Sequence, residues 1–144
     1  MARYRTTIRS HRRAEETFEY LSNFATTSEW DPGVVEAERL SNGPVELGST
    51  FRVVASFLGR RVSLLYRIVE FEPGRRVVLR ADAPMVRSVD EITVSAADGG
   101  SEVTYDADLR GRGLFRLADP LLGLAFRRIG DRARNGLART LAVA

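Results

Sequence analysis

The chain of 144 residues has the length of one domain, and we expect a single domain that spans residues 1–144. It contains no cysteine and only one histidine, His11, which excludes disulfides, thiolate chemistry and any site built from two or more histidines. The net charge of +3 rests on arginine alone, and we interpret it as codon usage rather than as a nucleic-acid-binding surface.

The first third of the chain predicts a strand, two short helical segments and a second strand. Residues 3–9 alternate in the manner of a half-buried strand, and residues 12–22 carry an apolar stripe at helical spacing. A short turn or helix over residues 23–28 leads to the string Trp30-Asp31-Pro32-Gly33, which breaks any regular element. A further strand is predicted over residues 34–40, followed by a loop.

Three hairpins follow, and their turns set the expected register of each strand pair. The turns fall at residues 58–61, 72–75 and 96–101, and each contains glycine. A slip of one residue would move a whole strand to the other face, so the agreement of all three registers indicates the fold strongly. The expected pairs are Phe57–Val62, Ala55–Leu64, Val53–Tyr66 and Phe51–Ile68, then Ile68–Leu79 and Tyr66–Ala81, then Val94–Val103, Ile92–Tyr105 and Asp90–Ala107.

These registers give the sheet one apolar and one polar face. Consecutive hairpins of this length are typical of an antiparallel meander with one dry and one solvated side. The polar face is expected to carry Arg52, Ser56, Ser63, Arg67, Arg76, Arg80, Glu91, Thr93, Thr104, Asp106 and Asp108.

A long helix is predicted at the end of the chain. Asp119-Pro120 is a good helix start, and the helix should run to Leu141, about 33 Å at 1.5 Å per residue. Gly130 and Gly136 each cost about 1 kcal/mol relative to alanine in a helix interior. Close packing against the sheet, or room for a ligand, would account for that cost.

The first half of this helix carries a second apolar stripe, formed by Leu117, Leu121 and Leu124, whereas arginines occupy that flank later. Four interpretations stay open: a helix start tucked under loops, a pocket gate, a contact between two copies in a homodimer, and a shallow contact with a membrane surface.

The order of elements and several local strings resemble the START-like (SRPBCC) superfamily, in particular its polyketide cyclase/dehydrase-like branch. The resemblance covers essentially the whole chain and implies an α+β helix-grip fold, in which a curved antiparallel sheet of about seven strands wraps round the C-terminal helix. It also implies a deep cavity that binds lipids, polyketides or other apolar molecules, and some members are enzymes. The strings are residues 18–23 (FEYLSN), 30–34 (WDPGV), 66–73 (YRIVEFEP) and 100–105 (GSEVTY).

The inner faces of sheet and helix supply the candidate ligand-binding residues, which either line a pocket or simply pack as core. Mostly apolar clefts with a few polar groups are typical ligand sites. The candidates are Trp30, Phe51, Val53, Ala55, Leu64, Tyr66, Ile68, Val77, Leu79, Asp90, Ile92, Val103, Tyr105, Leu122, Phe126 and Ile129.

Asp90, Tyr66 and Tyr105 are the candidate catalytic residues. An inward carboxyl is costly unless it is hydrogen-bonded, and its pKa tends to rise, which suits general acid–base work beside a tyrosine. In the alternative interpretation, Asp90 lies at a solvated strand end or pairs with Arg87. Trp30 either closes the pocket mouth or anchors a loop, and His11 is expected to be a solvated residue before the first helix.

Three functions follow. The first is binding of a small hydrophobic or aromatic molecule; the second is a cofactor-free polyketide cyclase or dehydratase that uses Asp90, Tyr66 and Tyr105; the third is a module that faces a membrane or partner through the helix flank. We expect no cofactor, no metal and no nucleic-acid partner. Without a membrane-length apolar run or a signal peptide, we expect a cytoplasmic protein with no transmembrane segment.

Overall fold

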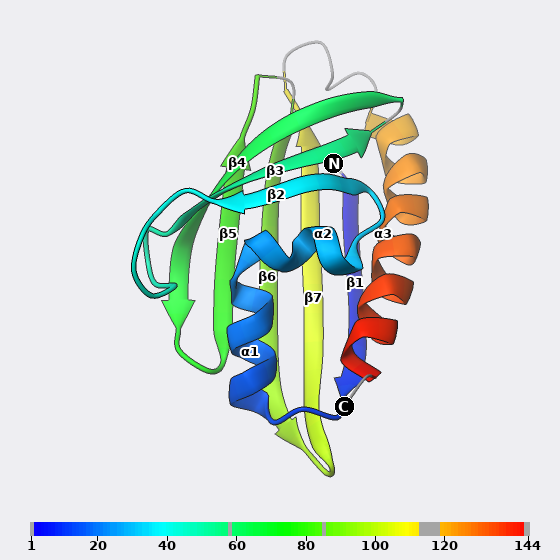
Figure 1. The fold of residues 1–144 in the computed structure, drawn as a ribbon. Coiled ribbons are helices and arrows are strands. Elements are labelled where there is room, and N and C mark those ends of the chain that lie inside the picture. Colours follow the sequence, from blue (N-terminus) through cyan, green and yellow to red (C-terminus); the bar gives the residue numbers. More distant parts are fainter. Residues whose placement is uncertain (1, 58, 85, 113–118, 143–144) are drawn as a thin grey trace.

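A curved seven-stranded antiparallel sheet, with the helices on its concave side, forms the body of the protein (Figure 1). The computed structural model describes residues 2–57, 59–84, 86–112 and 119–142, with side chains over 3–56, 59–84, 86–112 and 124–142. The strand order is β1-β7-β6-β5-β4-β3-β2. The elements are β1 (Ala2–Ser10), α1 (Ala14–Ser22), the 3₁₀ turn η1 (Phe24–Thr26), α2 (Thr27–Trp30), β2 (Val34–Arg39), β3 (Thr50–Phe57), β4 (Arg60–Glu72), β5 (Arg76–Asp82), β6 (Val86–Ala97), β7 (Gly100–Gly111) and α3 (Asp119–Ala142).

Two of the three predicted hairpin registers are confirmed. The pairs Tyr66–Ala81 and Ile68–Leu79 join β4 to β5, and β6 pairs with β7 through all three predicted pairs, Asp90–Ala107 among them. Because side chains alternate along each strand, these registers place the predicted apolar residues on the concave face. The chain thus forms the predicted α+β sheet with its long C-terminal helix and two short helices after β1.

The predicted register of β3 and β4 is wrong by two residues. Phe57 pairs with Arg60, so the connection spans two positions instead of four, and Phe51 pairs with Tyr66 rather than with Ile68. Gly59, at a φ of 77°, provides the left-handed backbone that such a tight hairpin needs. The remaining predicted pairs shift with it, to Val53–Leu64 and Ala55–Val62. An even shift keeps every side chain on its predicted face, which is why the inner face was still correct.

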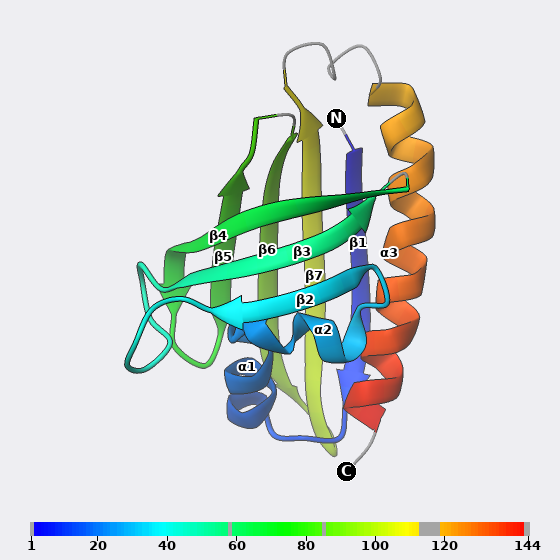
Figure 2. The same ribbon diagram turned by 45° about the horizontal axis from the view of Figure 1, so that its top comes forward.

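Two irregularities bend the sheet. The register shifts between Ile68 and Glu70 in β4 and between Val34 and Glu36 in β2. Bulges of this kind increase the local twist of a strand. Figure 2 shows the consequence: β2, β3 and β4 run across the direction of β6, β7 and β1, so the sheet curls into a trough.

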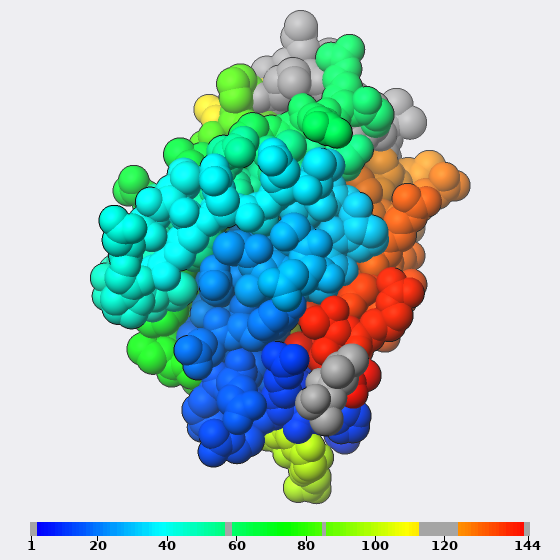
Figure 3. All heavy atoms as spheres, viewed as in Figure 1, coloured from blue at the N-terminus to red at the C-terminus, as the bar shows by residue number. Residues whose placement is uncertain are grey.

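Helices close the concave side of this trough. The helix α1 packs on β6 and β7, whereas α3 packs mainly on β1 and also contacts α2. Figure 3 shows α1, α2 and β2 covering this face, with α3 running beside them. None of the helices in the described ranges is long and apolar enough to cross a membrane.

Close packing accounts for two of the glycines inside α3, Gly130 and Gly136. A Cβ at Gly130 would overlap the ring of Tyr4 on β1, and a Cβ at Gly136 would overlap the backbone carbonyl of Trp30. Both glycines therefore let the helix backbone approach β1 and α2 more closely than any larger residue allows.

Candidate functional site

A cavity of about 160 Å³ lies between the concave face of the sheet and α3. Its wall is mostly apolar and is built from strands on both arms of the trough, from η1 and α2, and from one side of α3. Representative apolar members are Phe24, Val53, Leu64, Leu109, Phe126 and Ile129.

Many of the predicted ligand-binding residues line this cavity, and most of the others lie in the hydrophobic core. The cavity is lined by Trp30, Val53, Ala55, Leu64, Tyr66, Asp90, Tyr105, Phe126 and Ile129. Leu122 falls outside the residues whose side chains are described. The rest of the set belongs to the hydrophobic core instead: Phe51, Ile68, Val77, Leu79, Ile92 and Val103.

The core residues and the cavity-lining residues lie on the same strands. Along β4, β6 and β7 the change from core to cavity falls between two successive inward residues. On β4 it falls between Ile68 and Tyr66, on β6 between Ile92 and Asp90, and on β7 between Val103 and Tyr105. On the core side α1 fills the trough; the ring of Phe18, for example, lies 5.6 Å from that of Phe71. On the other side α2 and α3 bridge the trough without filling it, which leaves the cavity.

The polar side chains predicted for the inner face meet in one hydrogen-bond chain. The Tyr66 hydroxyl donates to Ser88 Oγ at 2.9 Å, and Ser88 Oγ donates to Asp90 Oδ1 at 3.0 Å. The Tyr105 hydroxyl donates to the other carboxylate oxygen, Asp90 Oδ2. Asp90 is only 7% exposed, and Arg87 pairs with Asp82 at 2.6 Å rather than with Asp90. The inward interpretation of Asp90 therefore holds, and Ser88 is a member that the sequence analysis missed.

Burial has the largest effect on the pKa values of the ionisable groups in this hydrogen-bond chain. It raises the pKa of Asp90 to about 6, although the hydrogen bonds from Tyr105 and Ser88 oppose the change. The pKa values of Tyr66 and Tyr105 are raised well above the usual range, first by burial and then by the charge of Asp90. Near neutral pH the site accordingly holds two neutral phenols and a carboxyl that readily takes up or releases a proton.

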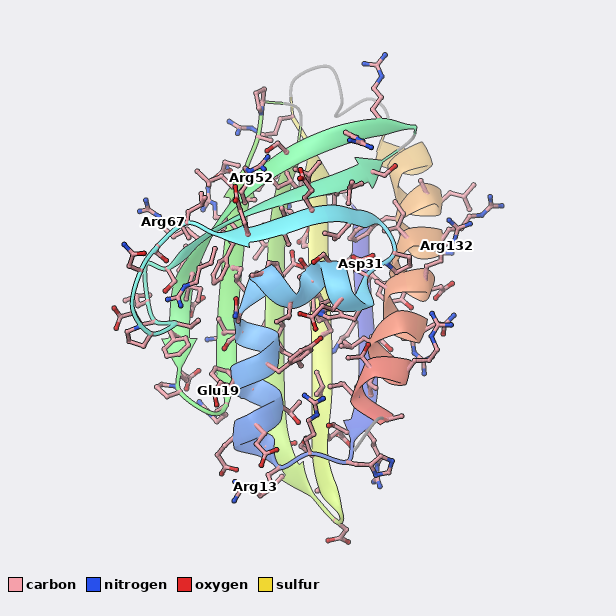
Figure 4. All side chains as sticks on the ribbon, viewed as in Figure 1. Arg13, Glu19, Asp31, Arg52, Arg67 and Arg132 are labelled. Atoms are coloured by element: carbon pink, nitrogen blue, oxygen red, sulfur yellow. The ribbon has the colours of Figure 1, made fainter. Side chains whose placement is uncertain are left out.

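A second carboxyl, that of Asp31, lines the same cavity and was not predicted. It follows α2 directly, and the Gly33 backbone N–H donates to its Oδ1 at 2.8 Å. Burial raises its pKa. Figure 4 shows Asp31 beside the end of α2, facing α3. The string Trp30-Asp31-Pro32-Gly33 predicts only a break in regular structure. The signal in the sequence for this second carboxyl is the position of Asp31 directly after Trp30, a candidate cavity residue.

Trp30 lines the cavity and also contacts α3. Its backbone carbonyl lies against Gly136 of α3, which anchors the loop, and its indole ring forms part of the cavity wall. The ring is 5% exposed and stands edge-on to Tyr105, with centroids 5.8 Å apart. Within the described part of the chain, the indole N–H has no hydrogen-bond partner.

Side chains of β1 and α3 join across one side of the cavity. The Tyr4 hydroxyl donates to Asp131 at 2.6 Å, and Arg134 Nε donates to Thr6 Oγ1 at 2.9 Å. The pKa of Tyr4 is raised to about 12, first by burial. Tyr4, Thr6 and Arg134 all line the cavity, and the sequence analysis predicted none of them as site residues.

The helix flank is described only in part. Leu124 is 59% exposed, whereas residue 117 and the side chain of residue 121 lie outside the described parts. Figure 4 shows Arg132 pointing away from the sheet. His11 is exposed between β1 and α1, as expected.

Comparisons with known proteins agree with this architecture. The family described as "Polyketide cyclase / dehydrase and lipid transport" matches residues 1–142. No curated protein matches the chain.

Solved structures of similar fold share little sequence. The Zhui aromatase/cyclase from Streptomcyes sp. R1128 has a TM-score of 0.78 at 17% identity and covers 96% of this chain and 92% of its own. A START superfamily protein from Mycobacterium smegmatis has a TM-score of 0.80 at 10% identity, with 98% and 97% covered. Ara h 8.0201 has a TM-score of 0.58 at 15% identity, with 92% and 95% covered. At these identities the likeness shows the fold alone.

Proposed function

Since the chain belongs to the polyketide cyclase/dehydrase and lipid transport family of the START-like superfamily, we propose that it binds a small aromatic or hydrophobic molecule in the cavity between the sheet and α3. The observation that carries this proposal is the cavity itself, an empty volume with a mostly apolar wall and a short polar chain on one side. Pockets of this composition bind ligands through apolar contacts, and their few polar groups determine the orientation of the ligand.

The volume of the cavity limits the size of the ligand. At about 160 Å³ it is close to engineered apolar cavities of about 150 Å³, which bind benzene. A molecule with one aromatic ring and a short polar arm therefore fits, whereas a long acyl chain or a multi-ring polyketide does not fit without a wider opening of the trough.

Trp30 provides the readout for a test. It is the only tryptophan in the chain, so its fluorescence reports on the cavity wall alone. We expect 2-phenylethanol to change the Trp30 emission in a saturable way and to bind with the same affinity by calorimetry.

A matched pair of variants locates the binding. Ala107→Phe fills the cavity from β7, whereas Ala96→Phe places the same ring on an exposed position of β6. We expect Ala107→Phe to weaken binding by about tenfold or more, because a displaced ligand loses its apolar contacts, and Ala96→Phe to bind as the parent does. Equal binding by both variants would place the ligand elsewhere and refute the proposal.

A cyclase or dehydratase is the second candidate, favoured by the convergence of Asp90, Tyr66 and Tyr105 on one cavity. With a pKa of about 6, the Asp90 carboxylate would accept a proton from the carbon beside a carbonyl. The same carboxyl would then return that proton to the departing hydroxyl, which leaves as water. Both tyrosine hydroxyls, however, already donate within the chain, to Ser88 and to Asp90, so a substrate carbonyl would have to compete for them.

Asp90→Asn separates the two candidates. It keeps the size and one acceptor oxygen of the side chain but can no longer carry a proton between substrate atoms. Unchanged ligand affinity with lost turnover of a single-ring β-hydroxyketone would support the enzyme. Turnover that survives this substitution would remove the acid–base role of Asp90.

A further inference from the structure

The two carboxyls of the cavity, Asp31 and Asp90, differ from Asp82 on the convex face of the sheet in their partners. On the convex face Asp82 pairs with Arg80 and Arg87, at 3.0 and 2.6 Å. Asp31 and Asp90 both line the cavity, and across the described ranges neither forms an ion pair. Their hydrogen bonds come from a backbone N–H and from hydroxyls, which carry no charge.

These two carboxyls also repel one another electrostatically when both are ionised. Burial is the largest cause that raises the pKa of each, and the charge of Asp31 raises the pKa of Asp90 further. A buried pocket that holds two acidic groups, neither of them ion-paired among the described residues, favours a positive ligand, because a cation supplies the charge that such groups otherwise lack.

Aromatic rings surround the same space. Phe24 stands edge-on to Tyr66, with centroids 4.9 Å apart, and Trp30 stands edge-on to Tyr105. All four rings line the cavity, together with Phe126 from α3. The faces of such rings attract cations, most strongly when water is excluded.

Arg134 is the one cationic side chain among the described residues of the cavity wall. It is exposed to solvent, donates to Thr6, and lies three residues from Asp131, which accepts from Tyr4. Its charge is felt at Tyr4, whose pKa it lowers against the effect of burial. Arg134 thus lies with Tyr4, Thr6 and Asp131 where β1 meets α3, and among the described residues it forms no ion pair with Asp31 or Asp90.

Resting on the proposed binding function, we propose that the cavity selects a protonated amine carried on a single aromatic ring. The ammonium group would neutralise the carboxyls of Asp31 and Asp90, and the ring would occupy the space between the aromatic wall and α3. A neutral alcohol of the same size would lose the charge interaction, and a carboxylate would be repelled.

Three probes of nearly equal size test this selection: 2-phenylethylamine, 2-phenylethanol and phenylacetate. Calorimetry at about pH 7.5 keeps the amine protonated and Asp90 largely ionised. We expect the amine to bind about tenfold or more tightly than the alcohol, because charge-assisted hydrogen bonds are the stronger class, and phenylacetate to bind most weakly.

Asp31→Asn is the decisive variant. Asparagine can still accept the Gly33 N–H, so the turn after α2 is retained while the charge is removed. We expect the amine to lose most of its advantage over the alcohol, because the charge that favours the ammonium group is removed. Asp98→Asn makes the same charge change at an exposed hairpin turn and should leave all three affinities as they are.

The outcomes separate the two proposals. Equal affinity for amine and alcohol, or an amine preference that survives Asp31→Asn, would overturn the selection of amines while leaving ligand binding intact. Tightest binding of phenylacetate would also overturn it and would point to Arg134 as the anchoring group. Failure of all three probes to bind, with unchanged Trp30 emission, would defeat the binding function as well.

Discussion

The concave face of the sheet has two halves that share strands and alternation but differ in what covers them. Under α1, inward residues such as Leu79, Ile92 and Val103 are fully buried in the core. Under α2 and α3, inward residues of the same strands line a cavity. A strand pattern thus determines which side chains point inward, whereas the helix above them decides whether they are packed or surround an empty volume.

The chemical character of the inner face changes at the same boundary. The cavity half contains Tyr66, Ser88, Asp90 and Tyr105, which satisfy one another by hydrogen bonds. Among the described residues, the buried polar groups under α1 are hydroxyls alone, those of Ser10 and Ser101, which bond to Thr17 of that helix. Buried polar groups are tolerated only with such partners. The ionisable inner residues Tyr66, Asp90 and Tyr105 lie in the half of the trough that is not filled.

The first prediction has the largest expected effect and compares the same substitution, leucine to alanine, in the packed half and at the cavity wall. Leu79→Ala in the packed half should lower the free energy of unfolding by about 4 kcal/mol, because it opens a new void. Leu64→Ala at the cavity wall should cost about 2 kcal/mol, because its side chain already lacks neighbours on one side. Urea unfolding measures both, and equal losses would mean that the cavity half is packed as tightly as the other.

The second prediction concerns pH and compares the cavity with the convex face. The pKa of Asp90 is raised from 3.8 to about 6 in the folded protein, so the folded state binds more protons than the unfolded state between these values. Stability relative to Asp90→Asn should therefore fall as pH rises from about 4 to 6, by roughly 3 kcal/mol in all.

Asp82 on the convex face should behave in the opposite way. Hydrogen bonds from Arg87 and Arg80 lower its pKa, so its contribution is present above its unfolded pKa and is lost as the pH falls through the folded value. Chemical unfolding of Asp90→Asn and Asp82→Asn across this range measures both. Differences from the parent that run in the same direction for the two variants would contradict the assignment.

The third prediction concerns the contacts that hold α3 over the cavity. Gly130→Ala and Gly136→Ala should each destabilise the protein by about 2 kcal/mol, because the added methyl group overlaps Tyr4 or the Trp30 carbonyl. Asn135→Ala, on the exposed side of the same helix, should change stability by a few tenths of a kcal/mol at most. Thermal unfolding compares the three, and a gain from Gly130→Ala would show that α3 does not rest on Tyr4.

Much of the fold could be predicted because alternation is a local property. The period of two along residues 86–97 and 100–111 determines their inner face, and Gly99-Gly100 places the turn between them. The β3–β4 connection was harder, because turns of two and of four residues at Gly59 both keep the same face inward. Only pairing across the whole sheet distinguishes the two registers.

The site was less predictable because it depends on contacts between distant parts of the chain. Asp90, Tyr66 and Tyr105 could be found from their inward positions, and the sequence alone determined that these few polar side chains share the apolar face. Asp31, Ser88, Arg134 and Tyr4 join them through the placement of α2 and α3. The tertiary structure decided where the trough is filled and where it is empty, because that depends on how closely two helices approach a curved sheet.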